Sequence, residues 1–290
     1  MLQVENISKR FYNIVALDDV SFSVPRGSVV GVVGPNGAGK STLFRILAGF
    51  LNPDSGAVRA SGGVMPAVGY KPERLLFPGQ MRVDSYLQLA ARLSLQRGAS
   101  ATTAVAEALA TVQLSSAARQ RIKNCSKGMR QRVGIAQTLL GQAPLLLFDE
   151  PWNGLDPAAQ TEVESVFRRL REEGRTLIIS THRLHELTRV CTHLVILSRG
   201  RVRYADALFA AQERQPQITI EDTRDLAPLA GILRPLHPGV RVAGSVVVLE
   251  GEAMALRRQV LSLLLSAGFD MVRLETQRKT LHDIYTEAIQ

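Results

Sequence analysis

The sequence predicts an α/β fold built on a mainly parallel sheet and followed by a small α+β domain. Continuous apolar runs are typical of strands buried on both faces, and helical stretches alternate with them. After about residue 210 the pattern changes to short segments in the order β-α-β-β-α-β, which is typical of a ferredoxin-like unit. We therefore expect two domains, at 1–210 and 215–290.

The composition is that of a globular protein with excess positive charge. Of 290 residues, 46% are hydrophobic and 21% charged, which excludes disordered classes, and the formal net charge is +9. No apolar run approaches the roughly 18 residues of a membrane span, and we expect no signal peptide at the N-terminus. Cys125 and Cys191 lack a zinc or redox spacing, which suits a reduced compartment. The charge favours nucleic acid, an anionic membrane or phosphates as partners.

The first buried strand leads through a glycine-rich turn into a helix. Val29–Val33 is apolar throughout, and Lys40–Ala48 places Leu43, Ile46 and Leu47 on one helix face. Because a strand, a tight turn and a helix follow each other without a gap, the turn is expected at the carboxyl edge of the sheet.

A helical insert separates this unit from the next strands. Residues 83–140 are rich in Ala, Leu, Arg and Gln at helical spacing, so we expect a helical subdomain over about 80–140. Buried strands are predicted at 145–148 and 176–180, with a helix between them. The apolar face of that helix contains Val163, Val166, Phe167 and Leu170.

The C-terminal segment supplies the elements of the second domain. Strands are predicted at 218–220, 240–243, 246–249 and 271–274, and helices at 223–235, 256–267 and 281–289. The segment has no ligand signature. Stabilising a dimer, plain scaffolding and binding a small regulator are therefore all open roles for it.

The glycine-rich turn fits the phosphate-binding pattern G-x-x-x-x-G-K-[ST]. Its residues are Gly34, Pro35, Asn36, Gly37, Ala38, Gly39, Lys40 and Ser41, followed by Thr42 on the helix. Backbone N–H groups of such a loop point at a di- or triphosphate, Lys40 would reach the β- and γ-phosphates, and Ser41 would offer its hydroxyl to Mg²⁺. A chance glycine-rich turn is the alternative, but the flanking strand and helix are the context that the motif requires.

Two carboxylates follow the second buried strand. Asp149 and Glu150 would lie at the carboxyl edge of the sheet, where ligands bind in such folds. Asp149 would hold the Mg²⁺ shell, and Glu150, pointing elsewhere, would orient or deprotonate an attacking water. A solvated strand end before Pro151 is the alternative, which the phosphate-binding loop makes less favourable.

With five further elements, the sequence resembles the ATP-binding subunits of ABC transporters over residues 1–210. These elements are Phe11, Glu73 in Gly69-Tyr70-Lys71-Pro72-Glu73, the segment Cys125-Ser126-Lys127-Gly128-Met129, Gly154-Leu155-Asp156, and His182 after Ser180-Thr181. The resemblance implies a P-loop NTPase ABC cassette with a parallel-sheet core, an antiparallel β subdomain and a helical subdomain. It also implies ATP as the ligand and ATP hydrolysis as the activity.

The resemblance also implies roles for single residues. Phe11 would stack on adenine, although a core phenylalanine would match equally well. Glu73 takes the place of the Q-loop glutamine near Mg²⁺, and His182 that of the histidine that donates from Nε2 to the γ-phosphate. His182 and His185 could also form a metal pair, but no third ligand is near. The expected catalytic residues are therefore Glu150, His182 and Lys40.

The segment around Ser126 stands where the family has its signature, which implies a dimer. Ser126, Lys127 and the Gly128 amide, at a predicted helix N-terminus, would bind the γ-phosphate of an ATP held by the P-loop of a second cassette. Two copies would close face to face around two ATP, and Asp156 would act across the interface. We expect a homodimer.

Three residues depart from the family pattern. Lys127 is unfavourable at the positive end of a helix dipole unless an anion docks there. Glu73 cannot donate a hydrogen bond when ionised, as a glutamine can, and Trp152 stands where a small polar residue is common. Because Glu150 and His182 are both present, we predict a site that hydrolyses ATP.

The motifs are similar to those of one exporter group. It serves drugs, antibiotics, lipids, polysaccharides and gliding systems, and includes the ATPase for copper-site maturation of nitrous oxide reductase. The chain would drive separate transmembrane permease subunits from the cytoplasmic face of the inner (plasma) membrane. The segment 73–83 would grip a permease helix through Leu75, Leu76 and Phe77, unless these three side chains belong to the core.

A soluble ABC ATPase acting on nucleic acid or ribosomes is the alternative function. Six basic residues and no acid lie from Arg119 to Arg132, but this run brackets the signature segment and would face ATP. The interval from Lys40 to Asp149 is too short for the coiled coil of the DNA-repair types. With 5% aromatic residues there is no obvious base-stacking platform. We therefore do not expect nucleic acid as a partner.

Overall fold

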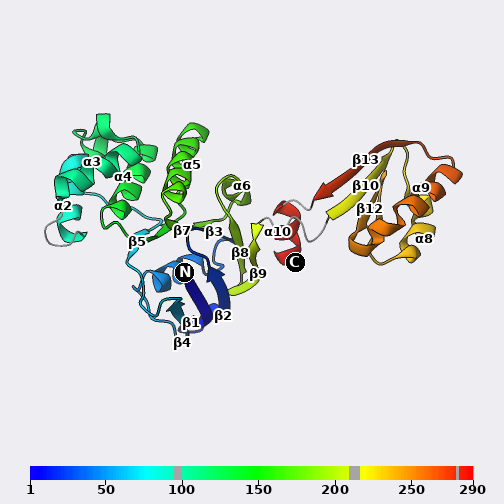
Figure 1. Cartoon of the computed structure of the whole chain (residues 1–290), viewed down its shortest axis with the longest axis horizontal. Coiled ribbons are helices and arrows are strands. Elements are labelled where there is room, and N and C mark those ends of the chain that lie inside the picture. The colour runs from blue at the N-terminus through cyan, green and yellow to red at the C-terminus, as the bar shows by residue number, and fades with distance from the viewer. Residues whose placement is uncertain (95–99, 209–215, 279–280, 290) are drawn as a thin grey trace. The chain divides into compact units, whose positions relative to one another are not determined.

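The chain folds into two compact units. The computed structural model describes residues 1–94, 100–208, 216–278 and 281–289. Contacts divide them into one unit of residues 1–207 and a second unit from residue 208 to 288 (Figure 1). Among the described residues, no helix is long and apolar enough to cross a membrane.

The first unit is built on a six-stranded sheet with the order β5-β6-β7-β3-β8-β9. Its strands are β3 (Val29–Val33), β5 (Val68–Lys71), β6 (Leu145–Asp149), β7 (Thr176–Thr181), β8 (His193–Ser198) and β9 (Arg201–Ala207). The first five pair in parallel, and β9 returns antiparallel beside β8. Because β3, β6 and β7 are buried along their whole length, the three predicted buried strands are confirmed.

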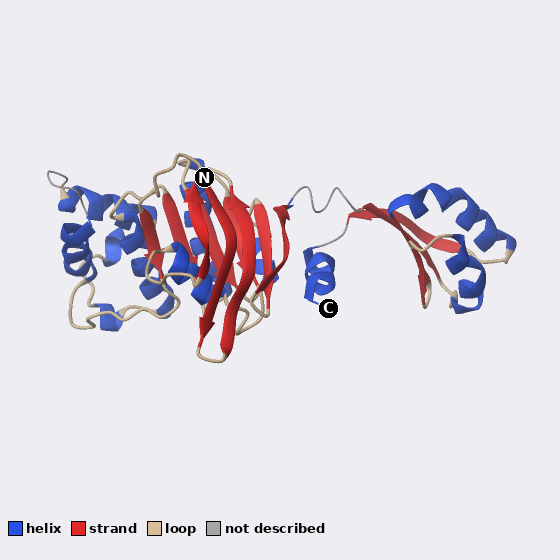
Figure 2. Ribbon diagram, turned by 90° about the horizontal axis from the view of Figure 1, so that it is seen from below, coloured by secondary structure: helices blue, strands red, loops and turns tan. Residues whose placement is uncertain are grey.

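A second, antiparallel sheet with the order β2-β1-β4 lies beside the first (Figure 2), and buried side chains of the two sheets form one core. Its strands are β1 (Leu2–Phe11), β2 (Ile14–Val24) and β4 (Ser55–Ala60). The helix α1 (Lys40–Leu47) contributes Leu43, Phe44, Ile46 and Leu47 to that core. Burying each such side chain stabilises the folded state by about 1.5–3 kcal/mol. The turn that precedes α1 is therefore held between two buried elements, β3 and α1.

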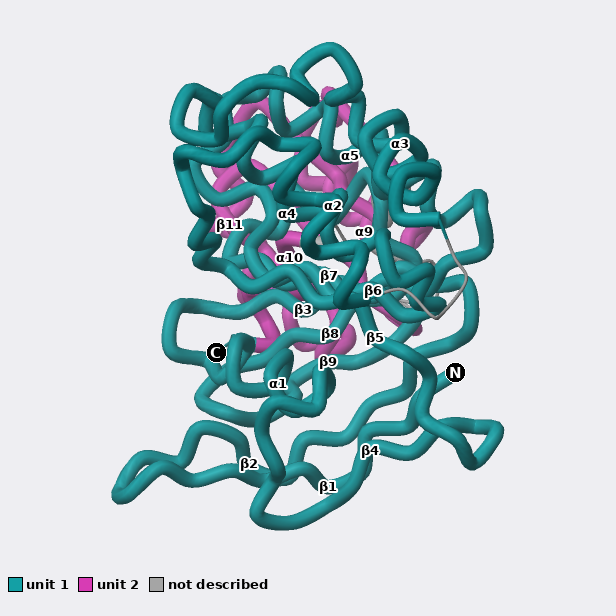
Figure 3. The backbone as a smooth tube through the Cα atoms, turned by 90° about the vertical axis from the view of Figure 1, so that its left-hand side faces the viewer, with its two compact units in different colours: residues 1–207, 289 teal, residues 208–288, 290 magenta. Residues whose placement is uncertain are grey.

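The predicted helical subdomain is present. It contains α2 (Val83–Ser94), α3 (Ala101–Thr111), two 3₁₀ turns, η1 (Ser115–Ala117) and η2 (Ile122–Asn124), and α4 (Lys127–Leu139). Figures 1 and 3 show α2, α3 and α4 together at the end of the first unit opposite β1, β2 and β4. Two more helices, α5 (Pro157–Glu172) and the short α6 (Leu184–Leu187), flank β7 in the chain.

The second unit has the ferredoxin-like arrangement. Its antiparallel sheet has the order β11-β12-β10-β13, from β10 (Pro216–Asp222), β11 (Val240–Ala243), β12 (Val246–Glu250) and β13 (Met271–Arg278). The helices are η3 (Ala227–Leu229), α8 (Ala230–Leu233), η4 (Arg234–Leu236), η5 (Gly251–Leu256), α9 (Arg257–Ser266) and α10 (Leu281–Ile289). This sheet order is the one that a β-α-β-β-α-β chain adopts, as the sequence predicts.

One boundary in this unit was predicted wrongly. The helical stretch expected from residue 223 begins only at Ala227. The side chain of Asp222 accepts a hydrogen bond from the backbone N–H of Arg224, and that of Asp225 accepts one from Ala227. Such aspartate turns compete with the helix for backbone donors, so the first residues stay outside it.

Candidate nucleotide-binding site

A cavity of about 560 Å³ opens around the glycine-rich turn. It is lined by Ile14, Val15, Ala16, Asn36, Gly37, Ala38, Gly39, Lys40, Ser41, Thr42, Glu73, Glu150, Asn153 and His182. The tertiary structure therefore brings together the phosphate-binding loop, one carboxylate after β6, the residue after β7 and the residue in the Q-loop position. Eight predicted residues do not line it. Four of them, Ser126, Lys127, Gly128 and Asp156, line a second cavity, and the other four are Phe11, Gly34, Pro35 and Asp149.

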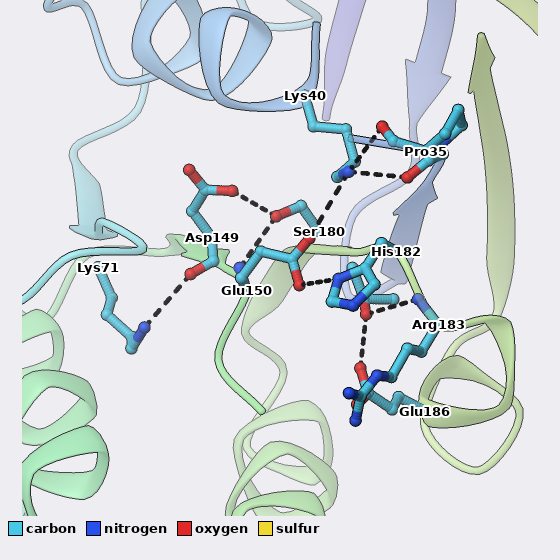
Figure 4. A network of polar contacts seen from close by, with 11 residues as sticks. Pro35, Lys40, Lys71, Asp149, Glu150, Ser180, His182, Arg183 and Glu186 are labelled. Atoms are coloured by element: carbon cyan, nitrogen blue, oxygen red, sulfur yellow. Dashed lines mark hydrogen bonds and ion pairs between the residues drawn. The ribbon is translucent and has the colours of Figure 1, made fainter. Parts of the chain in front are cut away.

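The phosphate-binding loop has the backbone that its glycines allow. Gly39, at the N-cap of α1, has φ 103°, and a Cβ atom there would collide with the carbonyl oxygen of Ala16. The Nζ atom of Lys40 donates to the carbonyl oxygens of Gly34 at 2.7 Å and Pro35 at 3.2 Å (Figure 4). With the positive end of α1 behind it, this loop is a ready anion site.

The two carboxylates after β6 point in different directions, as predicted. Asp149 is 1% exposed, and its Oδ1 atom accepts a hydrogen bond from Oγ of Ser180 at 2.5 Å. At Glu150 the backbone turns into the left-handed region, with φ 47°, and its N–H donates to the Ser180 hydroxyl oxygen at 3.0 Å. The Glu150 carboxylate then lies 3.6 Å from Nζ of Lys40 and 2.9 Å from Nδ1 of His182 (Figure 4). Ser180 was missed in the sequence, although its place before His182 was visible.

Hydrogen bonds among the residues next to His182 fix the backbone at that position. Thr181 donates its hydroxyl to Oε2 of Glu186 at 2.5 Å and accepts from the N–H of Arg183 at 3.0 Å. Glu186 is buried, and this burial raises its pKa. Because Nδ1 of His182 faces Glu150, Nε2 is the ring nitrogen left for a phosphate. His185 is exposed, which fits a surface residue better than a metal ligand.

A buried lysine that the sequence did not single out lies behind the two carboxylates. Lys71, the last residue of β5, is 0% exposed, and its Nζ atom donates to the carbonyl oxygens of Pro72 at 3.2 Å and Asp149 at 3.3 Å. Burial lowers the pKa of Lys71 to about 8, while the nearby charges of Asp149, Glu73 and Glu150 act to raise it. Two residues further on, Glu73 is exposed at the cavity wall.

The signature segment forms a second cavity, of about 280 Å³, together with the segment that precedes α5. Its lining residues are Ser126, Lys127, Gly128, Arg132, Gly154, Leu155, Asp156, Ala158, Ala159 and Glu162. Ser126 caps α4 by accepting from the N–H of Met129 at 3.1 Å, and Asp156 caps α5 by accepting from that of Ala159 at 2.8 Å. The two cavities share no lining residue.

The side chain of Lys127 lies against Gly154, which explains why this position holds a glycine. Its ammonium lies against Gly154, in the space that a Cβ atom would need, and Gly154 has φ 70°. Any larger residue at 154 would be strained and would push the lysine away. The charge of Lys127 is thereby held within the second cavity.

The aromatic predicted for adenine lies outside the first cavity. Phe11 pairs with Ile14 across the β1–β2 hairpin and is 39% exposed, with Nζ of Lys9 5.7 Å from its ring centre. Instead, the aliphatic residues after it, Ile14 and Val15, form the cavity wall on this side. At this exposure the core alternative is wrong, and the stacking of Phe11 on adenine stays a prediction.

Trp152, unexplained in the sequence, is a core residue. Its side chain is fully buried and meets the ring of Phe167 edge-on, with centroids 5.4 Å apart. Such a contact adds about 0.5–1.5 kcal/mol to the burial energy. Trp152 therefore packs the segment after Glu150 against α5.

Of the three apolar residues after Glu73, only one is strongly exposed. Leu76 is 93% exposed, whereas Leu75 covers Gly134 of α4 and Phe77 packs edge-on against Tyr86, with centroids 5.2 Å apart. The three side chains therefore differ. Leu76 is free to contact a permease helix, whereas Leu75 and Phe77 pack on α4 and α2, as in the core alternative.

The fold and the site together define an ABC-type ATPase, since a P-loop, the Glu150 carboxylate and the His182 ring meet in one cavity and the signature segment forms another. The comparisons agree. The sequence profile described as ABC transporter matches residues 17–153. The uncharacterized ABC transporter ATP-binding protein YxlF of Bacillus subtilis (strain 168) is 32% identical over 295 residues, covering 100% of this chain and 99% of that protein.

Other proteins share most of the chain. The Nod factor export ATP-binding protein I of Bradyrhizobium diazoefficiens is 32% identical, covering 85% of this chain and 84% of that protein. A solved ATP-binding subunit of an ABC transporter is 30% identical, with a TM-score of 0.63 over 73% of this chain and 92% of that one. The chain belongs to the family of ABC transporter ATP-binding proteins and is an ATP-hydrolysing enzyme of that class.

Proposed function

We propose that this chain is the ATPase subunit of an ABC exporter, in which two copies close head to tail around two ATP. Residues 1–210 would be the nucleotide-binding domain and 215–290 a small accessory domain. The separation of the two cavities supports this proposal, because one chain then carries two different halves of an ATP site. A second copy, turned by a two-fold rotation, would supply the missing half to each.

The side chains divide the chemistry between them. The P-loop amides and Lys40 would hold the phosphates, and Ser126, Lys127 and Gly128 of the other copy would bind the γ-phosphate. The Glu150 carboxylate would accept a proton from water, and Nε2 of His182 would donate to the γ-phosphate. Across the interface, Asp156 would join the two sites.

The donor set at the cavity fits Mg²⁺. Ser41 and Glu73 line the cavity, and Asp149 lies beside Glu150 at the end of β6. Hydroxyl and carboxylate oxygens are the ligands that Mg²⁺ prefers. When bound, the ion would offset the charge of the phosphates.

A mixing experiment tests the composite site. The Lys40→Ala protein and a Ser126→Trp protein would each be inactive alone, because every site in either dimer has one damaged half. A mixture of the two contains dimers with one intact site, so ATPase activity should return on mixing. Activity that does not return, while wild-type protein is active under the same conditions, would contradict the head-to-tail dimer.

We propose that the transport partner is a separate transmembrane permease, met at the cytoplasmic face of the membrane. The exposed Leu76, in the segment 73–83, would contact a permease helix. The export direction rests on similarity to proteins named for Nod factor export. Co-purification of the tagged chain with a membrane protein of several spans, lost on Leu76→Asp, tests this. Salt-sensitive retention of RNA or DNA instead would support the alternative function.

A further inference from the structure

Lys71 is a buried charge without an ion pair. Its side chain is fully buried, and it donates only to two backbone carbonyl oxygens within the part of the chain that the structure describes, at 3.2 and 3.3 Å. No carboxylate oxygen lies within 4.0 Å of it among these residues. Buried ammonium groups are retained where a negative field compensates for lost hydration.

That field comes from the nucleotide site. The Lys71 ammonium donates to the backbone of Asp149, Glu150 follows directly, and Glu73 is two residues further along the chain from Lys71. Glu73 and Glu150 line the cavity, and the charges of all three carboxylates act to raise the pKa of Lys71. Lys71 reaches them because β5 runs parallel to β6, with Lys71 opposite Phe148 in the register. The side chain then crosses to the Asp149 carbonyl, as Figure 4 shows.

We propose that Lys71 is a positioning residue of the ATPase site, whose buried positive charge offsets the third carboxylate, Glu73. Three carboxylates near one site would repel the phosphates of ATP and bind a divalent cation too strongly. One fixed ammonium behind them lowers the local negative potential without contacting the nucleotide. This inference rests on the proposed function, because it concerns ATP and Mg²⁺ at this cavity.

The charge role predicts opposite effects on anions and cations. Lys71→Met keeps the apolar stem and removes the charge, so metal-free ATP should bind about three- to tenfold more weakly. Mn²⁺, used as the probe ion on the ATP-bound protein, should bind more tightly by a similar factor. Glu73→Gln should shift both affinities in the reverse directions, and the double variant should return both close to the wild-type values.

Affinities are measured with fluorescent ATP in EDTA and with Mn²⁺ by electron paramagnetic resonance, at pH 7 and one salt concentration. Arg26→Met, at an exposed arginine before β3 that lines neither cavity, is the control and should change neither affinity. If Lys71→Met weakens both ligands, the lysine has only a structural role. Should that variant not fold, Lys71→Gln takes its place, because it removes the charge but keeps a donor for the two carbonyl oxygens. Unchanged affinities in that variant overturn the proposal. Wild-type protein that binds no ATP would contradict the proposed function instead.

Discussion

Nδ1 of His182 lies 2.9 Å from Oε2 of Glu150, so the residues after β6 and β7 meet over the P-loop cavity. Oε1 of the same carboxylate lies 3.6 Å from Nζ of Lys40. The positive φ of Glu150 makes this possible, because it turns the side chain away from the direction of Asp149. The left-handed backbone is an uncommon conformation for a glutamate, and Glu150 is the one non-glycine residue of the cavity lining that adopts it.

Glu150→Gln should lower the steady-state ATPase rate by about 10²- to 10⁴-fold, because an amide cannot accept the proton of the attacking water. ATP affinity should be retained, so size-exclusion chromatography with ATP should show a dimer. Phosphate release measures the rate. A rate that stays within twofold of wild type would remove Glu150 from its role as general base.

His182→Ala should lower the rate at saturating ATP, because it removes both the Nε2 donor and the partner of Glu150. His185→Ala is the matched control three residues away, on an exposed side chain, and should leave the rate unchanged. Equal losses in the two variants would show that the segment 182–185 matters for folding and not for phosphate contact.

Lys40→Ala should weaken ATP binding about ten- to hundredfold, since charge-assisted hydrogen bonds to phosphate contribute roughly 1.5–3 kcal/mol. Fluorescent ATP titration gives the affinity. The thermal unfolding midpoint without nucleotide should change little, because only backbone carbonyls and Glu150 lose a partner. Undiminished affinity would place the phosphates elsewhere.

Gly31→Ala should destabilise the first unit by about 1–3 kcal/mol through overpacking. Gly31 lies in β3, and a Cβ atom there would come within 2.7 Å of Leu187 Cδ1 and 2.8 Å of Cys191 Sγ. Denaturant unfolding, followed by the fluorescence of Trp152, the only tryptophan, measures the change. Leu187→Ala makes room for the new Cβ atom, so it should lower the free energy of unfolding less in the Gly31→Ala protein than in the wild type. If the two losses of stability simply add in the double variant, the two side chains do not clash.

Glu186→Gln should gain stability relative to wild type as pH rises through the acid range. Burial raises the folded pKa of Glu186 above 4.5, so the folded chain holds this proton more tightly than the unfolded chain does. The wild-type free energy of unfolding therefore loses a contribution as pH rises from below the unfolded pKa through the folded pKa, whereas glutamine does not titrate. Urea unfolding of both proteins at pH 4 and at pH 7 gives the difference between their free energies of unfolding at each pH. If this difference is the same at both pH values, the pKa of Glu186 is not raised.

The sequence by itself determined the parts whose information is local. A five-residue apolar run, a turn with Gly39 at φ 103° and an amphipathic helix are each encoded within about twenty residues, and all three were predicted. The helix caps are local as well, because a capping side chain reaches only three residues ahead. Ser126 was predicted at a helix N-terminus, whereas the cap by Asp156 was not predicted.

Only the tertiary structure decided what distant segments do to one another. Lys71 and Asp149 are 78 positions apart, and Glu150 and Ser180 are 30 apart, so no spacing in the sequence predicts their contacts. The partial burial of Leu75 depends on where α4 places Gly134, and the exposure of Phe11 depends on the path of the β1–β2 hairpin. Local periodicity predicts which face of an element is apolar, but the partner that covers that face is chosen by the packing of the whole unit.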